Sequence, residues 1–203
     1  MSQAPKLDPA STWLVSDTHF GHENIVGFAR RPHDHEQVIM EEWAQTVPDD
    51  GTVLHLGDLS YRNNSFFKNM IAKHLTGAQK LLIQGNHDRQ RPNFYRDSGF
   101  KIVKPFEIRY VTPKAGVWTV SFSHYPLKKS AHPLASAGGL RRVHIHGHIH
   151  NNGYGGKNSP FVPFSAGQIN ISVEQMHYRP CKLDDLLNGY IEGCYEPPKV
   201  EDK

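Results

Sequence analysis

The chain has 203 residues, of which 37% are hydrophobic and 21% are charged, which are ordinary values for a soluble globular protein and allow one well-packed domain or, at most, two small ones. No run of about 18 apolar residues is present, and the residues after Met1 lack the apolar core of a signal peptide, so a cytoplasmic protein without a membrane span is predicted. A net charge of +3 suits an anionic substrate but falls short of the dense basic patch of a dedicated nucleic-acid binder.

The first hundred residues predict alternating strands and helices. Each predicted strand is a short apolar run that ends at a glycine or a polar residue, and each predicted helix repeats apolar residues along one face. The predicted strands are Thr12–Ser16, Thr52–Leu56 and Lys80–Ile83. The predicted helices are His35–Val47, with Asp34 as N-cap, and Ser65–His74, with Gly77 beyond its end.

Closely spaced strands follow after residue 100, and a short helix closes the chain. The predicted strands are Lys101–Pro105, Glu107–Val111, Val117–Phe122, Arg142–His146 and Gln168–Val173, and the helix is Leu183–Tyr190. Strand–helix repeats followed by strands that look antiparallel favour an α/β sandwich. One domain is expected over residues 1–203, with irregular ends at 1–10 and 198–203. Cys181 and Cys194 are interpreted as thiols, since a disulfide is disfavoured in a reducing compartment.

Seven metal-capable side chains fall into five short clusters. The clusters are Asp17-Thr18-His19, Gly57-Asp58, Gly85-Asn86-His87-Asp88, Ser123-His124-Tyr125-Pro126 and Gly147-His148-Ile149-His150. The first three each follow a predicted strand, and sites in open α/β sheets gather at the carboxyl ends of strands. Carboxylates, imidazoles and one amide together form a ligand set for two adjacent divalent cations. A two-metal hydrolase is therefore the first hypothesis.

Each cluster also has a plainer interpretation. Asp17 and His19 would point to the same side of an extended strand end, but a loop aspartate and an exposed histidine would look the same. Asp58 resembles an ordinary turn residue, and His124 resembles a hydrogen-bonded histidine before a proline. The clusters therefore gain their meaning from their order and their placement, not singly.

The third and fifth clusters carry the most local information. Gly85 permits a sharp turn, Asn86 offers a neutral oxygen ligand, and His87 would stand beside the metals with its ring oriented by Asp88. In the fifth cluster, His144, His146, His148 and His150 would share one side of an extended segment, but Gly147 is expected to break that regularity. A histidine-rich surface strand is the alternative, and the roles of His144 and His146 stay open.

The ordered set resembles the calcineurin-like metallophosphoesterase family, whose pattern is Asp-x-His, Gly-Asp, Gly-Asn-His-(Asp/Glu), His and Gly-His-x-His. All five elements occur here in that order between residues 17 and 150. The segments Ser16–Ile25, Asn170–Glu174 and Tyr178-Arg179-Pro180 are further similar to a small bacterial and phage subgroup of predicted phosphoesterases.

The resemblance implies a fold and a division of roles. The implied fold is a two-sheet α/β/β/α sandwich of the metallo-dependent phosphatase type. Asp17, His19 and His150 would hold the first metal, Asn86, His124 and His148 the second, and Asp58 would bridge both. His87 would stabilise or protonate the leaving oxygen, with Asp88 as its partner.

Two cations would make phosphoester hydrolysis feasible without a protein nucleophile. They offset the negative charge of the ester, lower the pKa of a bridging water so that hydroxide forms near neutral pH, and align the attacking and leaving oxygens. The ligand set suits manganese, iron, nickel or zinc. Manganese is expected first, because cytosolic iron is easily lost or oxidised and no cysteine ligand selects zinc.

The substrate is left open by the sequence. No long insertion separates the motifs, so an open site is predicted that admits a phosphorylated small molecule, a nucleotide or a nucleic-acid end. His22 is a hypothetical contact to the substrate phosphate, although it also fits a polar helix N-terminus. The main alternative to a phosphomonoesterase or phosphodiesterase is a manganese-dependent nuclease or nucleic-acid end-processing enzyme. A binding module without catalysis is disfavoured by His87 and the complete ligand set.

Overall fold

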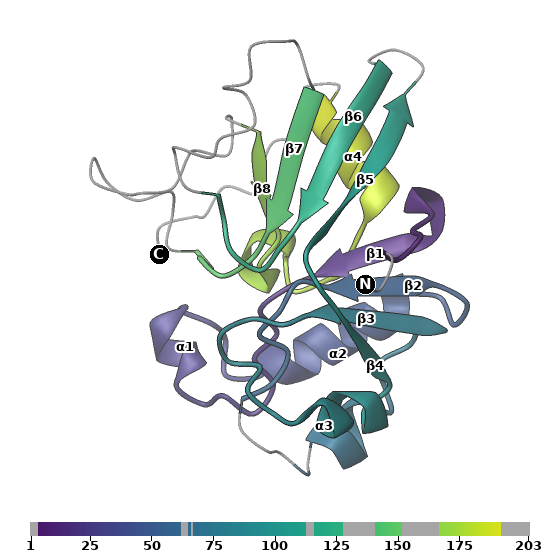
Figure 1. Cartoon of the computed structure of the whole chain (residues 1–203). Coiled ribbons are helices and arrows are strands. Elements are labelled where there is room, and N and C mark those ends of the chain that lie inside the picture. The colour runs from purple at the N-terminus through teal and green to yellow at the C-terminus, as the bar shows by residue number, and fades with distance from the viewer. Residues whose placement is uncertain are drawn as a thin grey trace.

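The computed structural model describes residues 4–61, 65, 67–112, 116–127, 141–151 and 167–191, and the strands among them form two sheets (Figure 1). The five-stranded sheet has the order β4-β3-β2-β1-β9, and the four-stranded sheet has the order β5-β6-β7-β8. The strands of the first sheet are β1 (Thr12–Val15), β2 (Thr52–His55), β3 (Gln79–Ile83), β4 (Phe100–Val103) and β9 (Cys181–Lys182). Those of the second are β5 (Phe106–Thr112), β6 (Gly116–Phe122), β7 (Arg141–His146) and β8 (Gln168–Asn170).

Four neighbouring strands of the first sheet run parallel. β1 pairs with β2, β2 with β3 and β3 with β4, so that His55 lies between Val15 and Leu82 in register. β9 joins the edge of β1 in the antiparallel direction. Because parallel strands end at the same edge of a sheet, the segments that follow β1, β2 and β3 meet there.

The second sheet corrects one prediction about strand direction. β5 and β6 form the expected antiparallel hairpin, but β6 pairs with β7 and β7 with β8 in parallel. A parallel pair needs a long connection, and residues 123–140 and 147–167 provide one in each case. The ends of β6 and β7 therefore lie at a common edge. A parallel bridge between Ser16 and Ser172 joins this edge to the end of β1.

Alternate residues of the first sheet pack into two separate cores. Leu14, Leu54 and Leu81 belong to a buried cluster shared with Val120 and Ile145 of the second sheet. Their neighbours Val15, Val53 and Leu82 belong to the other cluster, which contains the fully buried Trp43 of α2 (His35–Thr46). Successive residues of a strand point to opposite faces, so the first sheet is buried on both sides. In Figure 1, α2 lies on the side of this sheet away from the second.

The helices agree with the predictions only in part. α2 and α4 (Leu183–Ile191) match the predicted ranges to within one residue at each end, although the Asp34 side chain makes no capping hydrogen bond. Within the predicted helix at Ser65–His74, the described residues contain a π-helical segment at Phe67–Ile71, and residues 72–74 form a turn. The short helices α1 (Ile25–Phe28) and α3 (Pro92–Asp97) were not predicted.

The ends of the chain were predicted to be irregular. At the N-terminal end, a 3₁₀-helix at Pro9–Ser11 is capped by Asp8, which accepts a hydrogen bond from the Ala10 amide at 3.2 Å. Residues 198–203 and Cys194 lie outside the described residues, while Cys181 is a free cysteine. Among the described helices, none combines the length and the apolar character needed to cross a membrane.

Candidate metal centre

The candidate ligands sit on loops with an unusual backbone. Five of them have positive φ: Asp17 at 59°, His19 at 52°, Asp58 at 56°, His148 at 74° and His150 at 52°. A left-handed conformation costs a non-glycine residue about 1–3 kcal/mol and clusters at functional sites. Backbone hydrogen bonds hold these loops against each other, since the amides of Asp17 and His19 donate to the carbonyls of Gly57 and Asp58 at 2.9 Å each.

One group of potential ligands combines Asp17, His19 and His150. Their ligand atoms all lie within 4.8 Å of one another, and all three residues are buried. The Asp17 Oδ1 atom is 3.7 Å from His150 Nε2 and 4.0 Å from His19 Nε2. These are the three residues predicted for the first metal.

A second group combines Asp58, His124 and His148. His124 Nε2 lies 3.2 Å from His148 Nδ1 and 3.1 Å from Asn86 Oδ1. Asn86, His124 and His148 are the residues predicted for the second metal, and the structure brings all three together.

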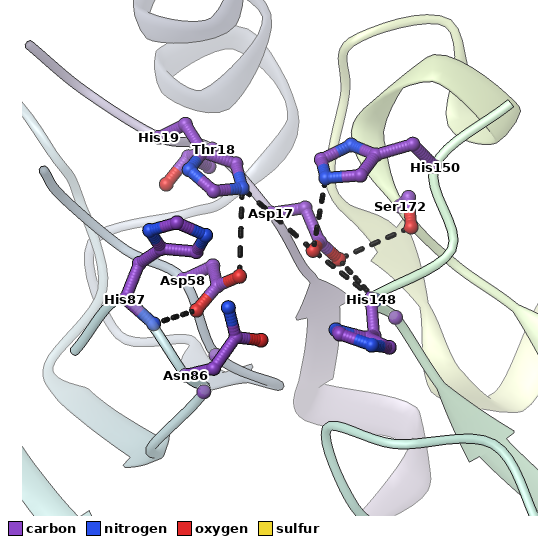
Figure 2. Close-up of polar contacts among 12 residues, drawn as sticks. Asp17, Thr18, His19, Asp58, Asn86, His87, His148, His150 and Ser172 are labelled. Atoms are coloured by element: carbon purple, nitrogen blue, oxygen red, sulfur yellow. Dashed lines mark hydrogen bonds and ion pairs between the residues drawn. The ribbon is translucent and has the colours of Figure 1, made fainter. Parts of the chain in front are cut away.

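Asp58 lies between the two groups. Its Oδ2 atom is 3.5 Å from His19 Nε2 in the first group and 3.4 Å from His124 Nε2 in the second. Its other oxygen accepts a hydrogen bond from the His87 amide at 2.8 Å. Figure 2 shows the Asp58 carboxylate between the His19 ring and Asn86. This position is the one expected of a carboxylate that bridges two cations.

The donor atoms fit divalent cations. The Nε2 atom of His19 is buried and has no hydrogen-bond partner, an arrangement that costs free energy unless another ligand satisfies it. Burial lowers the pKa of His19 well below its ordinary value, which favours the neutral imidazole that binds metals. Burial alone would raise the pKa of Asp58, but the hydrogen bond and charge of His124 outweigh it and lower that pKa. His19 is thus available as a neutral imidazole and Asp58 as an ionised carboxylate. Against the effect of burial, Asp58 and Asp17 raise the pKa of His124 to about 9, so a cation in the second group would displace the proton of that imidazole.

Asp17 connects the first motif to the last. Both of its carboxylate oxygens accept from the His148 amide, at 3.1 Å and 2.9 Å, and Ser172 Oγ donates to Oδ2 at 3.1 Å. Figure 2 shows these contacts converging on Asp17 from the His148–His150 side. A Cβ atom at Gly147 would collide with Ser16 and Asp17, so the approach of the last motif requires glycine.

A buried ion pair between Arg31 and Glu174 lies next to the first ligand group and contacts His150. Glu174 Oε1 lies 2.9 Å from His150 Nδ1 and accepts a hydrogen bond from Arg31 Nε at 2.7 Å. Arg31 also donates to the main-chain oxygens of Thr18 at 2.9 Å and Asp17 at 2.5 Å. A carboxylate on the far nitrogen of a metal-binding imidazole fixes the orientation of the ring. Sequence reasoning assigned no role to either Arg31 or Glu174, and no local pattern marks them as a pair.

The hydrogen bonds of Asp88 differ from the predicted ones. Its carboxylate accepts from three backbone amides, those of Asp58 at 2.7 Å, Gly85 at 2.8 Å and Leu59 at 3.0 Å, and none of its contacts is with the His87 ring. Burial raises the pKa of Asp88 to about 6 despite these bonds. Asp88 therefore ties the loop of the bridging carboxylate to the loop of Asn86, and the turn between residues 85 and 88 directs it away from its neighbour's ring.

His87 and His22 stand beside the ligand groups. The His87 ring centroid is 5.1 Å from that of His19 and 5.7 Å from that of His22. His22 stacks on Tyr61 with centroids 4.0 Å apart and an interplanar angle of 15°. Burial, followed by the charge of His87, lowers the pKa of His22. Both rings lie next to the ring of His19, and neither residue belongs to a ligand group.

The row of four histidines divides at Gly147 as expected. His144 and His146 lie on β7 with their rings stacked at 5.8 Å, and both are buried, which argues against a histidine-rich surface strand. His144 Nδ1 lies 2.8 Å from Ser121 Oγ, and His146 Nδ1 lies 2.8 Å from the Gly147 carbonyl. Neither belongs to the ligand groups found among the described residues.

Comparison with known proteins agrees with this geometry. The model of the calcineurin-like phosphoesterase superfamily domain matches residues 11–177, which include every candidate ligand. The chain belongs to this superfamily. Membership, together with the two ligand groups, supports a phosphoester hydrolase that uses divalent metals.

Two of the similar proteins match over most of the chain, and a third matches over less than half of it. An uncharacterized protein of Methanocaldococcus jannaschii, MJ1445, is 29% identical over 187 residues, covering 89% of this chain and 92% of its own length. The Gene 66 protein of Mycobacterium phage L5 is 33% identical over 92 residues, which cover 41% of this chain and 42% of that protein. The crystal structure of the Aquifex aeolicus protein of unknown function AQ665 superposes with a TM-score of 0.62 at 24% identity, over 87% of this chain and 97% of that one. This last likeness concerns the fold alone.

Proposed function

We propose that this protein is a dinuclear metal-dependent phosphoesterase. The position of Asp58 carries the proposal, because one of its oxygens lies within 3.5 Å of an imidazole from each ligand group. A carboxylate oxygen that lies close to imidazoles of both ligand groups is placed to bridge two cations, as a centre with two metals requires. The fold that goes with this function is a single domain over residues 1–203, with its two sheets packed as a sandwich between helices.

The metal ligands divide into two sets that share Asp58. Asp17, His19 and His150 hold the first cation, and Asn86, His124 and His148 hold the second. Manganese is the expected metal in a cytoplasmic protein, with iron, nickel or zinc as alternatives, since oxygen and imidazole donors suit all of them.

The metals and the protein make different contributions to the reaction. When bound, two divalent cations offset the charge of a phosphate and make water nucleophilic near neutral pH. His87, which is no member of either ligand group, donates a proton to the leaving oxygen. His22 contacts a non-bridging phosphate oxygen and is positioned by its stack on Tyr61. Asp88 acts on the loops through its backbone hydrogen bonds and holds Asp58 in place.

The test combines metal analysis with a panel of esters. The protein is loaded with manganese, its metal content is measured, and hydrolysis of nitrophenyl phosphate, bis-nitrophenyl phosphate and 2′,3′-cyclic nucleotides is followed. We expect close to two metals per chain and turnover of at least one ester. A preparation that holds two metals and hydrolyses none of the panel would contradict the proposal, and would favour a binding module.

A further inference from the structure

Two exposed aromatic side chains stand at the edge of the metal centre. Among the described residues, the large hydrophobic side chains that are exposed are Phe28 (64%), Val111 (67%), Val117 (45%) and Tyr125 (48%). Val111 lies on β5 and Val117 on β6, and the two residues pair with each other across the strands. Both aromatic residues contact imidazoles of candidate ligands. Single exposed apolar residues are common, but both of these aromatic residues lie next to candidate metal ligands, which indicates that they contact a substrate bound there.

Each ligand group has one of these rings beside it. The Phe28 ring, at the end of α1, lies 6.0 Å from the ring of His150 at 84°. The Tyr125 ring, just after β6, lies 4.7 Å from the ring of His148 at 66° and 4.8 Å from that of His124 at 79°. His150 belongs to the first group, and His124 and His148 to the second. Each ligand group thus has one exposed aromatic ring next to it, so a phosphate held by both groups would have a ring near each of them.

We propose that Phe28 and Tyr125 stack on the two bases that flank the scissile phosphate of a single-stranded nucleic acid. This inference rests on the proposed function and specifies its substrate class. A phosphomonoester carries one organic group and would use one ring at most, whereas an internucleotide diester carries a base on each side. Bases of a single strand have free faces that stack on aromatic side chains, while the bases of a duplex already stack on each other.

A nearby positive charge suits the same ligand. Arg89 is exposed on the loop that carries Asn86, and its Nε atom donates to the Asn86 main-chain oxygen at 2.7 Å. This contact holds a guanidinium beside the second ligand group. Nonspecific single-strand binding combines aromatic stacking with cationic contacts to the backbone, so preference for one base sequence is not expected.

The experiment combines protein variants that lack one aromatic ring with substrate analogues that lack one base. The full chain, loaded with manganese, is assayed on the thymidine dinucleotide TpT and on two analogues that each lack one thymine. The variants are Phe28→Ala and Tyr125→Ala, with Tyr125→Phe as the conservative change and Val111→Ala as an exposed apolar control away from the site. Each alanine variant at the site is expected to lower kcat/KM on TpT roughly ten- to a hundredfold. Val111→Ala and Tyr125→Phe should stay within about threefold of the wild type.

Base dependence is what separates stacking from general damage. On the analogue that lacks the base on its own side, each alanine variant is expected to lose less than about threefold. Binding of fluorescein-labelled tetrathymidylate and of an abasic tetramer, measured by anisotropy with calcium in place of manganese, gives a readout that does not depend on turnover, and only the first should weaken in the variants. Equal losses with and without bases overturn the stacking proposal, as does a wild type that cleaves nitrophenyl esters but not TpT. If the two-metal protein hydrolyses no ester at all, the proposed function itself fails.

Discussion

Replacement of Glu174 by glutamine tests the buried ion pair behind the first ligand group. The Glu174 side chain is 4% exposed and that of Arg31 is 0% exposed, and their closest atoms, Oε1 and the terminal guanidinium nitrogen, are 2.6 Å apart. Glutamine keeps the size of the side chain but removes its charge. Arg31 would then be a buried cation without a counter-ion, and His150 would exchange a charged acceptor for the weaker, neutral amide oxygen of glutamine.

The structure sets the expected size of the effect. Removal of one partner from a buried ion pair costs about 3–5 kcal/mol. Because Arg31 keeps its bonds to the main-chain oxygens of Asp17 and Thr18, we expect the lower end, about 3 kcal/mol in the free energy of unfolding. In urea this is a fall of about 1–3 M in the unfolding midpoint. Loss of the carboxylate that orients a metal-binding histidine typically weakens metal affinity about 10- to 100-fold.

Urea unfolding of the metal-free protein and calorimetric titration with manganese measure the two effects separately. Glu42→Gln is the matched control, because the Glu42–Arg179 pair is much more exposed, at 26% and 57%, with 3.1 Å between its charged atoms. Such a surface pair contributes about 0–1 kcal/mol, so the control should change neither measurement much. A Glu174→Gln protein whose free energy of unfolding is within about 1 kcal/mol of the wild type and which binds manganese equally well would contradict the role assigned to the Arg31–Glu174 pair.

The same variant has a further consequence at acid pH. Burial raises the pKa of Glu174, but the hydrogen bond of His150 and the charge of Arg31 outweigh it, so the folded pKa lies below the ordinary value of 4.5. A carboxylate with a depressed pKa adds stability that is fully present above the unfolded pKa and is lost as the pH falls below it. The stability difference between wild type and Glu174→Gln should therefore shrink below about pH 4.5, as measured by urea unfolding across this range.

Three further substitutions test the centre itself. Asp58→Asn should abolish hydrolysis of every ester and lower the metal content below two per chain, as measured by elemental analysis; full metal content with retained turnover would contradict a bridging role. His87→Ala should leave the metal content intact and reduce kcat most for esters with poor leaving groups, whereas an equal reduction for nitrophenyl and alkyl esters would argue against proton donation. Gly147→Ala should lower both stability and metal affinity, because the added Cβ collides with Asp17, while the control Gly27→Ala has open space around its Cβ and should lose neither.

The local elements were largely predictable because hydrophobic patterning is a local property. The ranges of β1, β2 and β3 match the predicted strands to within one residue at each end. α1 was missed because four residues are too few to show helical periodicity. Strand direction was not predictable either, since alternation looks the same in both directions. The parallel pairing of β6 with β7 depends on the path of the connection between them.

The partners of individual side chains were harder to predict than the residues themselves. Arg31 and Glu174 are 143 positions apart in the chain, and no motif contains both. The expected contact between Asp88 and the His87 ring followed from their adjacency, but the turn at Gly85 aims the carboxylate at three backbone amides. Adjacency in sequence says little about contact within a tight turn.

The sequence determines which residue types form the candidate metal centre, the order in which they occur and their positions after predicted strands. These features identify the candidate ligands, because the type of a side chain and the end of a strand can both be recognised from a short stretch of sequence. Only the tertiary structure decides that Asp58 lies between two groups of imidazoles and that Arg31 and Glu174 stand behind one of them. The reason is physical: distances between remote side chains depend on strand direction and on left-handed loop residues such as Asp17 and His148, which local patterns do not encode.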